Sequence, residues 1–480
     1  MKLQSLAVEI MKSARAGETS LDLWKGYCEK IKNVVDNLNH TSICSIIHSF
    51  GHMRYKHTQL LSVLSTNLYK SVPFLTTKQI TSVLKSFSLL NFKNEFMMQI
   101  LSKHAAKLAP MMNPYELSTL LYSYASLNSC NLYVFYPIKC SVSDKIDKFG
   151  PKELSLLLGG LCKINCDDLQ LITVVSSHFC KTISSNDPKS LSLSSNYLLR
   201  LKLGNSKIVA MFIAREIMRY KPKFSSQGLS LILNSISKYN DDISLFQRYS
   251  MIIQLRIDEF NIHSCCLVAS AVSRANYKEI KLLEVLAERV GKQSNELYPQ
   301  AVATLAYSFA KLNHLHGPLM YYSGKHLVSY LEDYTLDQIC MIIKSYFILH
   351  IDDKEVLEFV IISLKHNWCL DKSGHKFAIK NSTTCGLLWI MECYAAFLIV
   401  NEDVYKCMEL IVQELSGRVD EMSREMAICL LHGMSFYQIK DLNLVDKINK
   451  HLGKLTSLKG NEMSDREARL VKNALEVLTN

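Results

Sequence analysis

One helix-pair pattern recurs along this 480-residue chain, mostly at intervals of 37 residues. Its clearest marker is a small residue followed by an aromatic one, in Ser49-Phe50, Ser86-Phe87, Ser123-Tyr124, Ser308-Phe309 and Ser345-Tyr346. Degenerate copies continue the phase at Ser13, Gly160, Tyr197, Ser235, Ala271, Cys393 and Gly433. Such a period is typical of an array of supersecondary units, each burying its apolar face on the next. The sequence therefore predicts an all-α fold, an α-solenoid of about twelve helix-turn-helix repeats of roughly 37 residues.

Each copy also begins with a helix start signal in the same phase. Candidate N-caps are Thr76, Asn113, Gly150, Asp187, Tyr298 and Thr335. A Gln or Glu follows three residues later, as a capping box requires, at Gln79, Glu116, Glu153 and Gln338. Within the first helix, apolar residues at offsets 0, 3, 4, 7 and 10 predict one wide buried face, as in Ile80, Val83, Leu84, Phe87 and Leu90.

The spacing divides the chain into four segments. Residues 1–37 predict an N-terminal helix pair, whose amphipathic start is either the first helix of the array or an organellar transit segment. Residues 38–365 are regular repeats, and residues 366–386 form an insertion loop where the interval grows to 48 residues. Residues 387–480 predict degenerate repeats and a capping helix. The most apolar run, residues 385–400, is short and contains Glu392, which favours a buried helix over a membrane span.

Charge is distributed unevenly along the chain. Residues 1–240 contain 29 Lys and Arg against 14 Asp and Glu, whereas residues 241–480 contain 26 against 30. This asymmetry predicts contact with a polyanion in the first half, and protein contact or solvation in the second. An uneven surface charge without a function stays open as the alternative. The 15 cysteines are scattered singly, which is typical of reduced, buried thiols.

The apolar stripe of the first helix is the basis of a family resemblance. Its fullest copies are Leu117–Leu127 (LSTLLYSYASL) and Val302–Leu312 (VATLAYSFAKL). With the 37-residue period, they resemble the heptatricopeptide repeat proteins, organellar helical-repeat proteins similar to the octotricopeptide repeat and FAST kinase-like proteins. Tetratricopeptide repeats instead keep about 34 residues and a Trp-Leu-Gly-Tyr pattern that is absent here.

The resemblance implies a mitochondrial matrix protein that binds RNA. Its expected partners are ribosomal or messenger RNA and ribosomal or other RNA-processing proteins, in RNA processing, RNA stability or mitoribosome assembly and structure. Many relatives end in a RAP domain, a small nuclease-like α/β module, and no segment of this sequence resembles it. The departure puts RNA cleavage in doubt for this chain.

RNA contacts are predicted first in one column of residues. The residue just before the marker points away from the core stripe, and in helical repeats equivalent side chains can each read a base. The candidates in this column are His48, Lys85, Tyr122, Asn196, Asn234, Tyr307 and Lys344, and its other members are Gly159, Ser270 and Glu392. A column of solvated polar residues would have the same pattern, so that interpretation stays open.

The densest basic stretch supplies the second set of candidates. It contains Lys189, Arg200, Lys202, Lys207, Arg215, Arg219, Lys221 and Lys223, interrupted only by Glu216. Clustered cations of this kind bind phosphates without regard to sequence, although an ordinary lysine-rich outer face would look the same. Tyr197 and Tyr220 lie among them and could stack on bases, but Tyr197 has the phase of the core. Reversing Arg215, Arg219, Lys221 and Lys223 to Glu is expected to weaken RNA binding with little loss of folding.

Signals for catalysis or metal binding are weak. Cys162 and Cys166 have no second pair, and His366, Cys369 and His375 fit no common zinc spacing. No phosphate-cradling glycine loop and no nucleophile elbow occur. The sequence thus favours a non-enzymatic protein without metal or cofactor. A protein-interaction scaffold of armadillo-like type is the main alternative, and a ribonuclease-associated factor is a third.

Overall fold

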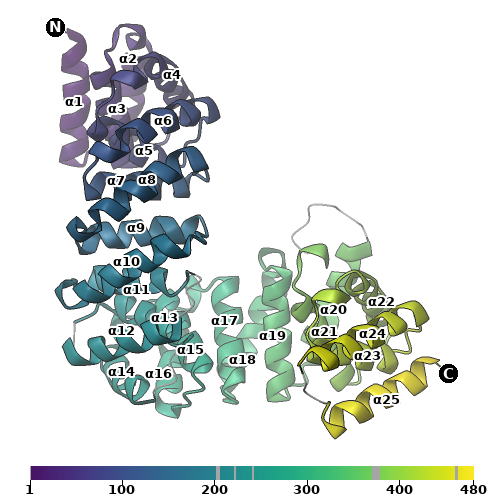
Figure 1. Ribbon diagram of the computed structural model, residues 1–480. Coiled ribbons are helices and arrows are strands. Elements are labelled where there is room, and N and C mark those ends of the chain that lie inside the picture. Colours follow the sequence, from purple (N-terminus) through teal and green to yellow (C-terminus); the bar gives the residue numbers. More distant parts are fainter. Residues whose placement is uncertain are drawn as a thin grey trace. The chain divides into compact units, whose positions relative to one another are not determined.

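The computed structural model describes residues 2–201, 206–220, 223–239, 243–369, 379–459 and 463–479. Every element in these ranges is a helix, and the α-helices follow one another as pairs from α1–α2 to α23–α24, with α25 at the end (Figure 1). We call the odd-numbered first helices A helices and the even-numbered second helices B helices. The predicted all-α, helical-repeat fold is confirmed. The chain forms two units, Met1–Asp241 and Asp242–Asn480.

Unit 1 contains seven A helices in its described residues: α1 (Lys2–Ala16), α3 (His40–Met53), α5 (Thr77–Leu89), α7 (Pro114–Ser126), α9 (Pro151–Lys163), α11 (Pro188–Leu198) and α13 (Ser226–Ile236). Its B helices are α2 (Leu21–Lys32), α4 (Thr58–Leu68), α6 (Glu95–Leu108), α8 (Leu132–Lys145), α10 (Leu169–Thr182) and α12 (Ser206–Tyr220). Short 3-10 helices follow most B helices, at η1 (Val35–Asn37), η2 (Tyr69–Phe74), η3 (Ala109–Met111), η4 (Ile146–Lys148) and η5 (Ile183–Ser185).

Unit 2 begins with the B helix α14 (Ile243–Leu255). Its A helices are α15 (Ile262–Arg274), α17 (Pro299–Lys311), α19 (Leu336–Leu349), α21 (Thr384–Ala396), α23 (Arg424–Phe436) and α25 (Asp465–Thr479). Its other B helices are α16 (Ile280–Lys292), α18 (Gly317–Ser329), α20 (Lys354–Cys369), α22 (Glu402–Ser416) and α24 (Leu442–Lys459). Its 3-10 helices are η6 (Ile257–Glu259), η7 (Ser294–Glu296), η8 (Leu331–Asp333), η9 (Ile379–Asn381) and η10 (Val419–Glu421).

Within each unit, consecutive A helices pack directly on one another, α1 on α3 and onward to α13, and α15 on α17 and onward to α25. The marker explains this packing. Its aromatic residue is fully buried, as at Phe50, Phe87 and Tyr124. Its serine is also buried, and its hydroxyl donates to the carbonyl four residues earlier, at 2.9 Å for Ser49 and 2.7 Å for Ser123. A small side chain whose polar group is already satisfied allows two A helices to approach closely.

The A helices end in one recurring way. One or two residues after the end of most A helices, the backbone has a positive φ of 44° to 56°, at Arg54, Asn91, Asn128, Asn165, Asn276, Asn313, His350, Leu398 and Gln438. Asparagine tolerates this left-handed conformation better than most residues, which explains its frequency at these positions. The turn then leads directly into the B helix.

The B helices secure the start of the A helix in their own repeat. The ring nitrogen Nε2 of His104 lies 2.8 Å from the Leu75 carbonyl oxygen, and that of His178 lies 3.0 Å from the Phe149 carbonyl oxygen. Arg289 donates from Nε to the Phe260 carbonyl at 2.9 Å. In each case the carbonyl precedes the donor by 29 residues. The three repeats therefore place a donor of the B helix against the carbonyl at the equivalent position before the A helix.

Most of the predicted N-caps are present. Thr76, Asn113 and Thr335 each form a complete capping box, and Asp187 accepts from the amide of Ser190. Gly150 and Tyr298 occupy the equivalent backbone position without a side-chain cap.

Replacing Asn113 with Ala is expected to lower the free energy of unfolding by about 1 kcal/mol, because it removes the oxygen that accepts from the Glu116 amide at 2.9 Å. Urea unfolding measures the loss. Asn33→Ala is the matched control, since Asn33 has right-handed helical backbone and an exposed side chain. A loss in the control as large as that in Asn113→Ala would contradict the assignment of this cap.

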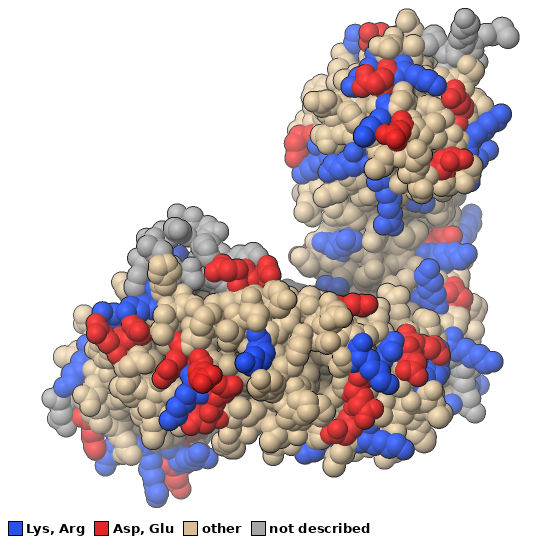
Figure 2. Space-filling view, turned by 180° about the vertical axis from the view of Figure 1, so that it is seen from behind, with Lys and Arg blue, Asp and Glu red and all other residues tan. Residues whose placement is uncertain are grey.

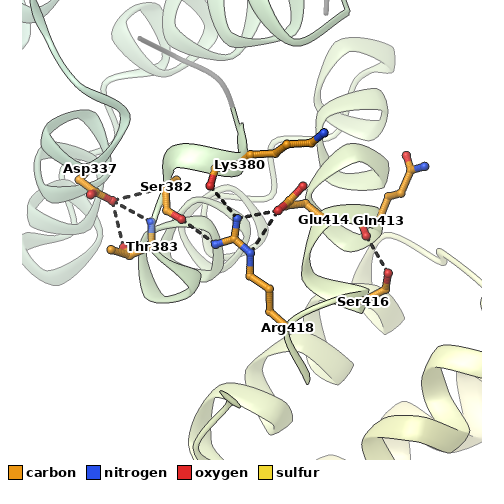
Figure 3. A network of polar contacts seen from close by, with 8 residues as sticks. All are labelled: Asp337, Lys380, Ser382, Thr383, Gln413, Glu414, Ser416 and Arg418. Atoms are coloured by element: carbon orange, nitrogen blue, oxygen red, sulfur yellow. Dashed lines mark hydrogen bonds and ion pairs between the residues drawn. The ribbon is translucent and has the colours of Figure 1, made fainter. Parts of the chain in front are cut away.

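The predicted insertion, residues 366–386, lies partly outside the described residues. Where the chain is described again, a polar network holds η9 and the start of α21 (Figure 3). Arg418 donates to the carbonyls of Ser382 at 2.6 Å and Lys380 at 3.1 Å, and it pairs with Glu414 at 2.6 Å. Asp337 accepts from the amide of Thr383 at 3.1 Å. These contacts join the segment to α19 and α22, so the array resumes in register after the longer interval.

Candidate nucleic-acid interface

We call the predicted residues that precede each marker the A-helix column. The structure places His48 and Lys85 on the surface, whereas Tyr122, Asn196, Asn234, Tyr307 and Lys344 are half-buried. None points into the hydrophobic core, so the column lies on the outward side of consecutive A helices. The column positions of neighbouring A helices in unit 1 are joined by the contacts described next.

The column of unit 1 begins with clustered cations. Burial, followed by the neighbouring His52, Lys85 and Arg15, lowers the pKa of His48. Its ring nitrogen Nδ1 is 3.0 Å from the Ser82 hydroxyl oxygen of the next A helix. Positive groups from α1, α3 and α5 thus lie close together. Burial and these groups both favour the neutral form of His48, and a nearby anion would oppose them.

Lys85 continues the column toward α7. Its Nζ donates to the Tyr115 hydroxyl at 3.0 Å and lies 5.6 Å from the centroid of that ring. This contact holds the lysine in place without neutralising it, because the partner is a phenol rather than a carboxylate. The charge of Lys85 therefore stays available to a phosphate.

Aromatic side chains follow on α7 and α11, with Gly159 of α9 between them. Lys163 lies with Nζ 5.4 Å from the ring centroid of Tyr122. The Tyr122 and Tyr197 rings meet above Gly159, since a Cβ built on that glycine would be 3.1 Å from an atom of each. Tyr197, predicted to have the phase of the core, is half-buried, and Arg200 lies near enough to act on its hydroxyl. The Asn196 side-chain oxygen accepts from the Ser235 hydroxyl at 3.0 Å.

In unit 2, the side chains of the column residues Lys344 and Tyr307 have partners within the unit. Lys344 Nζ is 2.6 Å from a carboxylate oxygen of Glu392 and 4.3 Å from the Phe347 ring centroid, so its charge is already compensated. Tyr307 packs on Trp389 with ring centroids 5.4 Å apart. Because the lysine and the tyrosine both have partners within the unit, this part of the column is less suited to phosphate binding than the part in unit 1.

The described members of the predicted basic stretch are divided between an A helix, α11, and a B helix, α12. Lys189 lies at the start of α11, and Arg200 lies just after that helix, both exposed beside the A-helix column. Lys207, Arg215 and Arg219 are exposed on α12, a B helix. Lys223 is exposed after α12, and Glu216 is buried. Lys202 and Lys221 lie outside the described residues, as does the side chain of Tyr220.

Sequence reasoning missed several residues that the fold brings to the column. Arg15, His52, Tyr115 and Lys163 all contact or influence its members. Their signal was available: His52 and Lys163 follow the column residue of their own helix by four, which places them on the same helix face. The contacts of Arg15 and Tyr115 depend on neighbouring helices, which the period alone does not specify.

Figure 2 shows basic and acidic side chains interspersed on one face, with wide uncharged areas between them. Net charge alone therefore does not locate an anion-binding surface. The A helices of unit 1 from α3 onward nevertheless contain few carboxylates. α3, α5, α11 and α13 contain no Asp or Glu, and the single glutamates of α7 and α9, Glu116 and Glu153, lie in the first helical turn.

No group of three or more His, Cys, Asp or Glu side chains in the described part of the chain is placed to hold a metal ion. Cys162 and Cys166 are free thiols, at the end of α9 and in the turn after it. His366 lies near the end of α20, whereas the side chains of Cys369 and His375 are outside the described residues. No described helix has both the length and the apolarity needed to cross a bilayer.

A groove occupies the C-terminal part of unit 2. It has a volume of about 650 Å³, and α21, α23 and α25 contribute most of its lining. The apolar part of the lining includes Ile428, Phe436 and Leu470, and Glu392 and Glu425 lie at the same site. Leu398 also lines the groove, is 73% exposed and has a φ of 56°, a conformation that costs energy for a leucine.

No protein-family profile matches the chain, and no curated protein matches its sequence. Among solved structures, it is similar to the pentatricopeptide repeat protein PPR10 from maize, with 12% identity, coverage of 98% of this chain and 70% of the other, and a TM-score of 0.41. The complex of PPR10 with an 18-nt psaJ RNA element gives 11% identity, coverage of 99% and 79%, and a TM-score of 0.38. A homology model of the full-length AP-3 complex gives 11% identity, coverage of 99% and 87%, and a TM-score of 0.33. All three similarities are distant.

Proposed function

We propose that this protein binds RNA along the A-helix column of unit 1 and does so without catalysing a reaction. One observation carries the proposal. From Arg15 to Arg200, cations and tyrosines lie at or beside the column, while the A helices from α3 to α11 have no carboxylate beyond the first turn. Cations attract the phosphates of a nucleic acid, and aromatic rings and amides contact its bases.

The spacing of the column fits an extended polyanion better than a small ligand. Lys85, Lys163 and Arg200 belong to α5, to α9 and to the turn after α11, so they are spread over several repeats. No carboxylate within ion-pair distance of these three residues occurs among the described residues. A chain of phosphates can contact all of them at once, which a single anion cannot.

Filter binding of purified protein to single-stranded RNA at several salt concentrations tests the proposal. We expect the logarithm of the association constant to fall linearly with the logarithm of salt concentration, by about 0.7 per phosphate contact. Retention that is absent even at low salt would contradict it. Cleavage of the bound RNA in the presence of a divalent metal would instead support the ribonuclease alternative.

RNA affinity should also depend on pH through the column. The pKa of His48 is lowered in the free protein, mainly by burial and then by His52, Lys85 and Arg15. A nearby phosphate would raise it, so the complex binds more protons than the free protein and affinity must rise as pH falls. We expect a several-fold gain between about pH 7.5 and 5.5, reduced in His48→Gln. A flat profile, or one unchanged by His48→Gln, would remove His48 from the interface.

The cellular part of the proposal is a role in the mitochondrial matrix, in RNA processing or stability or in the assembly and structure of the mitoribosome. It is supported by the resemblance of the repeat stripe to heptatricopeptide repeat proteins. Fractionation of mitochondria, followed by sedimentation of ribosomal subunits with and without ribonuclease, tests it. Absence from the mitochondrial fraction would contradict the location, and a position independent of ribosomal particles would favour a processing factor.

A protein-interaction scaffold is the second candidate function, and the groove beside Leu398 is the observation that favours it. An exposed leucine in a left-handed turn, where five other repeats have asparagine, adds nothing to stability. Crosslinking in cells distinguishes the two functions. Recovery of a protein partner that is lost in Leu398→Asp, without any attached RNA, would favour the scaffold.

A further inference from the structure

The A-helix column has one gap, and two tyrosines fill it. Every other copy from His48 to Glu392 has a side chain at the column position, whereas α9 has Gly159. A Cβ at Gly159 would be 3.1 Å from Cε2 of Tyr122 and 3.1 Å from Cε2 of Tyr197. These distances are closer than ordinary van der Waals contact, so a larger residue would displace both rings. The missing side chain is thus what allows rings from α7 and α11 to meet across α9.

Helix packing does not require the tyrosine on α11. Tyr197 occupies the small position of the marker, which is serine in Ser49, Ser86, Ser123, Ser235, Ser308 and Ser345. Those serines are 0–3% exposed between neighbouring A helices, and they pack there with a satisfied hydroxyl. A serine would serve the same purpose on α11. The structure instead has a half-buried aromatic ring and, on the adjacent helix, the glycine that accommodates it.

The surroundings of the two rings are cationic. Lys163 Nζ lies 5.4 Å from the centroid of the Tyr122 ring. Burial raises the pKa of Tyr197, and the charge of Arg200, three residues later in the chain, opposes this rise. Neither tyrosine hydroxyl has a hydrogen-bond partner among the described residues. Two aromatic rings, two cations and two available hydroxyls are therefore gathered at one place on the column.

We infer that Tyr122 and Tyr197 form a stacking site for one unpaired nucleobase, with Lys163 and Arg200 contacting the phosphates on either side. The inference rests on the proposed RNA binding and narrows its ligand to single-stranded RNA. A base in a duplex is already stacked and paired, so it is unable to stack on these rings. Base–aromatic stacking is strong enough to change affinity by about ten-fold or more for one base.

The test compares two double variants. Tyr122→Leu/Tyr197→Leu removes the rings, and Tyr133→Leu/Tyr136→Leu removes two exposed tyrosines from the B helix α8 as a control. The probes are a labelled single-stranded RNA of mixed sequence, about 16 nucleotides long, and the corresponding duplex. We expect the first variant to lose about ten-fold or more of its single-strand affinity with an unchanged salt slope, because no phosphate contact is removed. The control should bind as the unmodified protein does.

Two further variants keep the test independent of folding. Tyr122→Phe/Tyr197→Phe retains the rings and should keep affinity within a few-fold. Gly159→Ala leaves both tyrosines in place but crowds their rings, and we expect it to weaken single-strand binding more than duplex binding. Equal single-strand affinity in the Leu variant and the control would overturn the stacking site while leaving RNA binding intact. Failure of the unmodified protein to bind either probe would overturn the proposed function itself.

Discussion

Reversing Lys85, Lys163 and Arg200 to Glu is expected to lower the affinity for single-stranded RNA by roughly 100-fold at about 0.1 M salt. Each phosphate contact with a single strand contributes about 0.7 to the salt slope, which at this salt concentration is about five-fold in affinity. The three residues lie at or beside the A-helix column, on α5, on α9 and after α11, and among the described residues no carboxylate forms an ion pair with them. Equilibrium binding over a salt series measures both the affinity and the slope.

The control variant reverses three exposed lysines on B helices, Lys103, Lys107 and Lys181. It carries the same change in net charge, so a purely long-range effect would lower affinity equally in both variants. We expect the B-helix variant to retain affinity within a few-fold and to keep its salt slope. Equal losses in the two variants would mean that the column is not the contact surface.

A third variant, Lys207→Glu/Arg215→Glu/Arg219→Glu, tests whether the basic stretch on α12 also contacts RNA. These cations stay predicted RNA contacts. Their position on a B helix separates them from the column, so their effect on affinity can be measured by itself. If this variant loses as much RNA affinity as the reversal of Lys85, Lys163 and Arg200, then RNA contacts both helices of the repeat.

Replacing Phe87 with Ala is expected to destabilise unit 1 by about 3–5 kcal/mol. Phe87 is fully buried as the aromatic of its marker, and its ring centroid is 5.2 Å from that of Phe92. Its removal leaves a cavity at the junction of neighbouring A helices, and repeats depend on their neighbours for stability. The loss should be visible in urea unfolding as a lower transition midpoint.

Phe96→Ala is the matched control for this prediction, because it makes the same change on the adjacent helix α6. Phe96 is 61% exposed, so its loss should alter the free energy of unfolding by no more than about 0.5 kcal/mol. Similar losses in the two variants would show that the marker aromatic is not the main packing residue of the repeat.

The fold could be predicted from the sequence because one signal repeats in phase at several levels. The stripe Leu117, Leu120, Leu121, Tyr124 and Leu127 is buried as expected, with 0–4% exposure. The capping boxes at Thr76, Asn113 and Thr335 are present as well. Because the local caps and the 37-residue period agree, the helical-repeat fold can be predicted from the sequence.

Other recurring features were present in the sequence but went unrecognised. Asparagines 91, 128 and 165 are spaced by 37 residues, and all three have the left-handed backbone that ends an A helix. His104 and His178 likewise occupy one position of the B helix and contact a carbonyl 29 residues earlier. The asparagines end an A helix and the histidines contact a carbonyl only because of where the backbone turns. The periodicity of apolar residues does not show where these turns lie.

The candidate site was less predictable than the fold. A run of cations that is continuous in sequence is divided between α11 and α12, because consecutive helices of a repeat present different surfaces. Lys344 was predicted as an RNA contact, and its pairing with Glu392 depends on an interval lengthened to 48 residues. The convergence of Tyr122 and Tyr197 on Gly159 requires three helices at once, beyond what spacing within one helix can show.

Photo-crosslinking of the purified protein to single-stranded RNA, with the crosslinked peptides identified by mass spectrometry, shows directly whether the A-helix column of unit 1 contacts RNA. We expect the crosslinks to concentrate on the outward side of α3 to α11, at or beside His48, Tyr122 and Tyr197. Crosslinks confined to B helices, or to unit 2 alone, would contradict it.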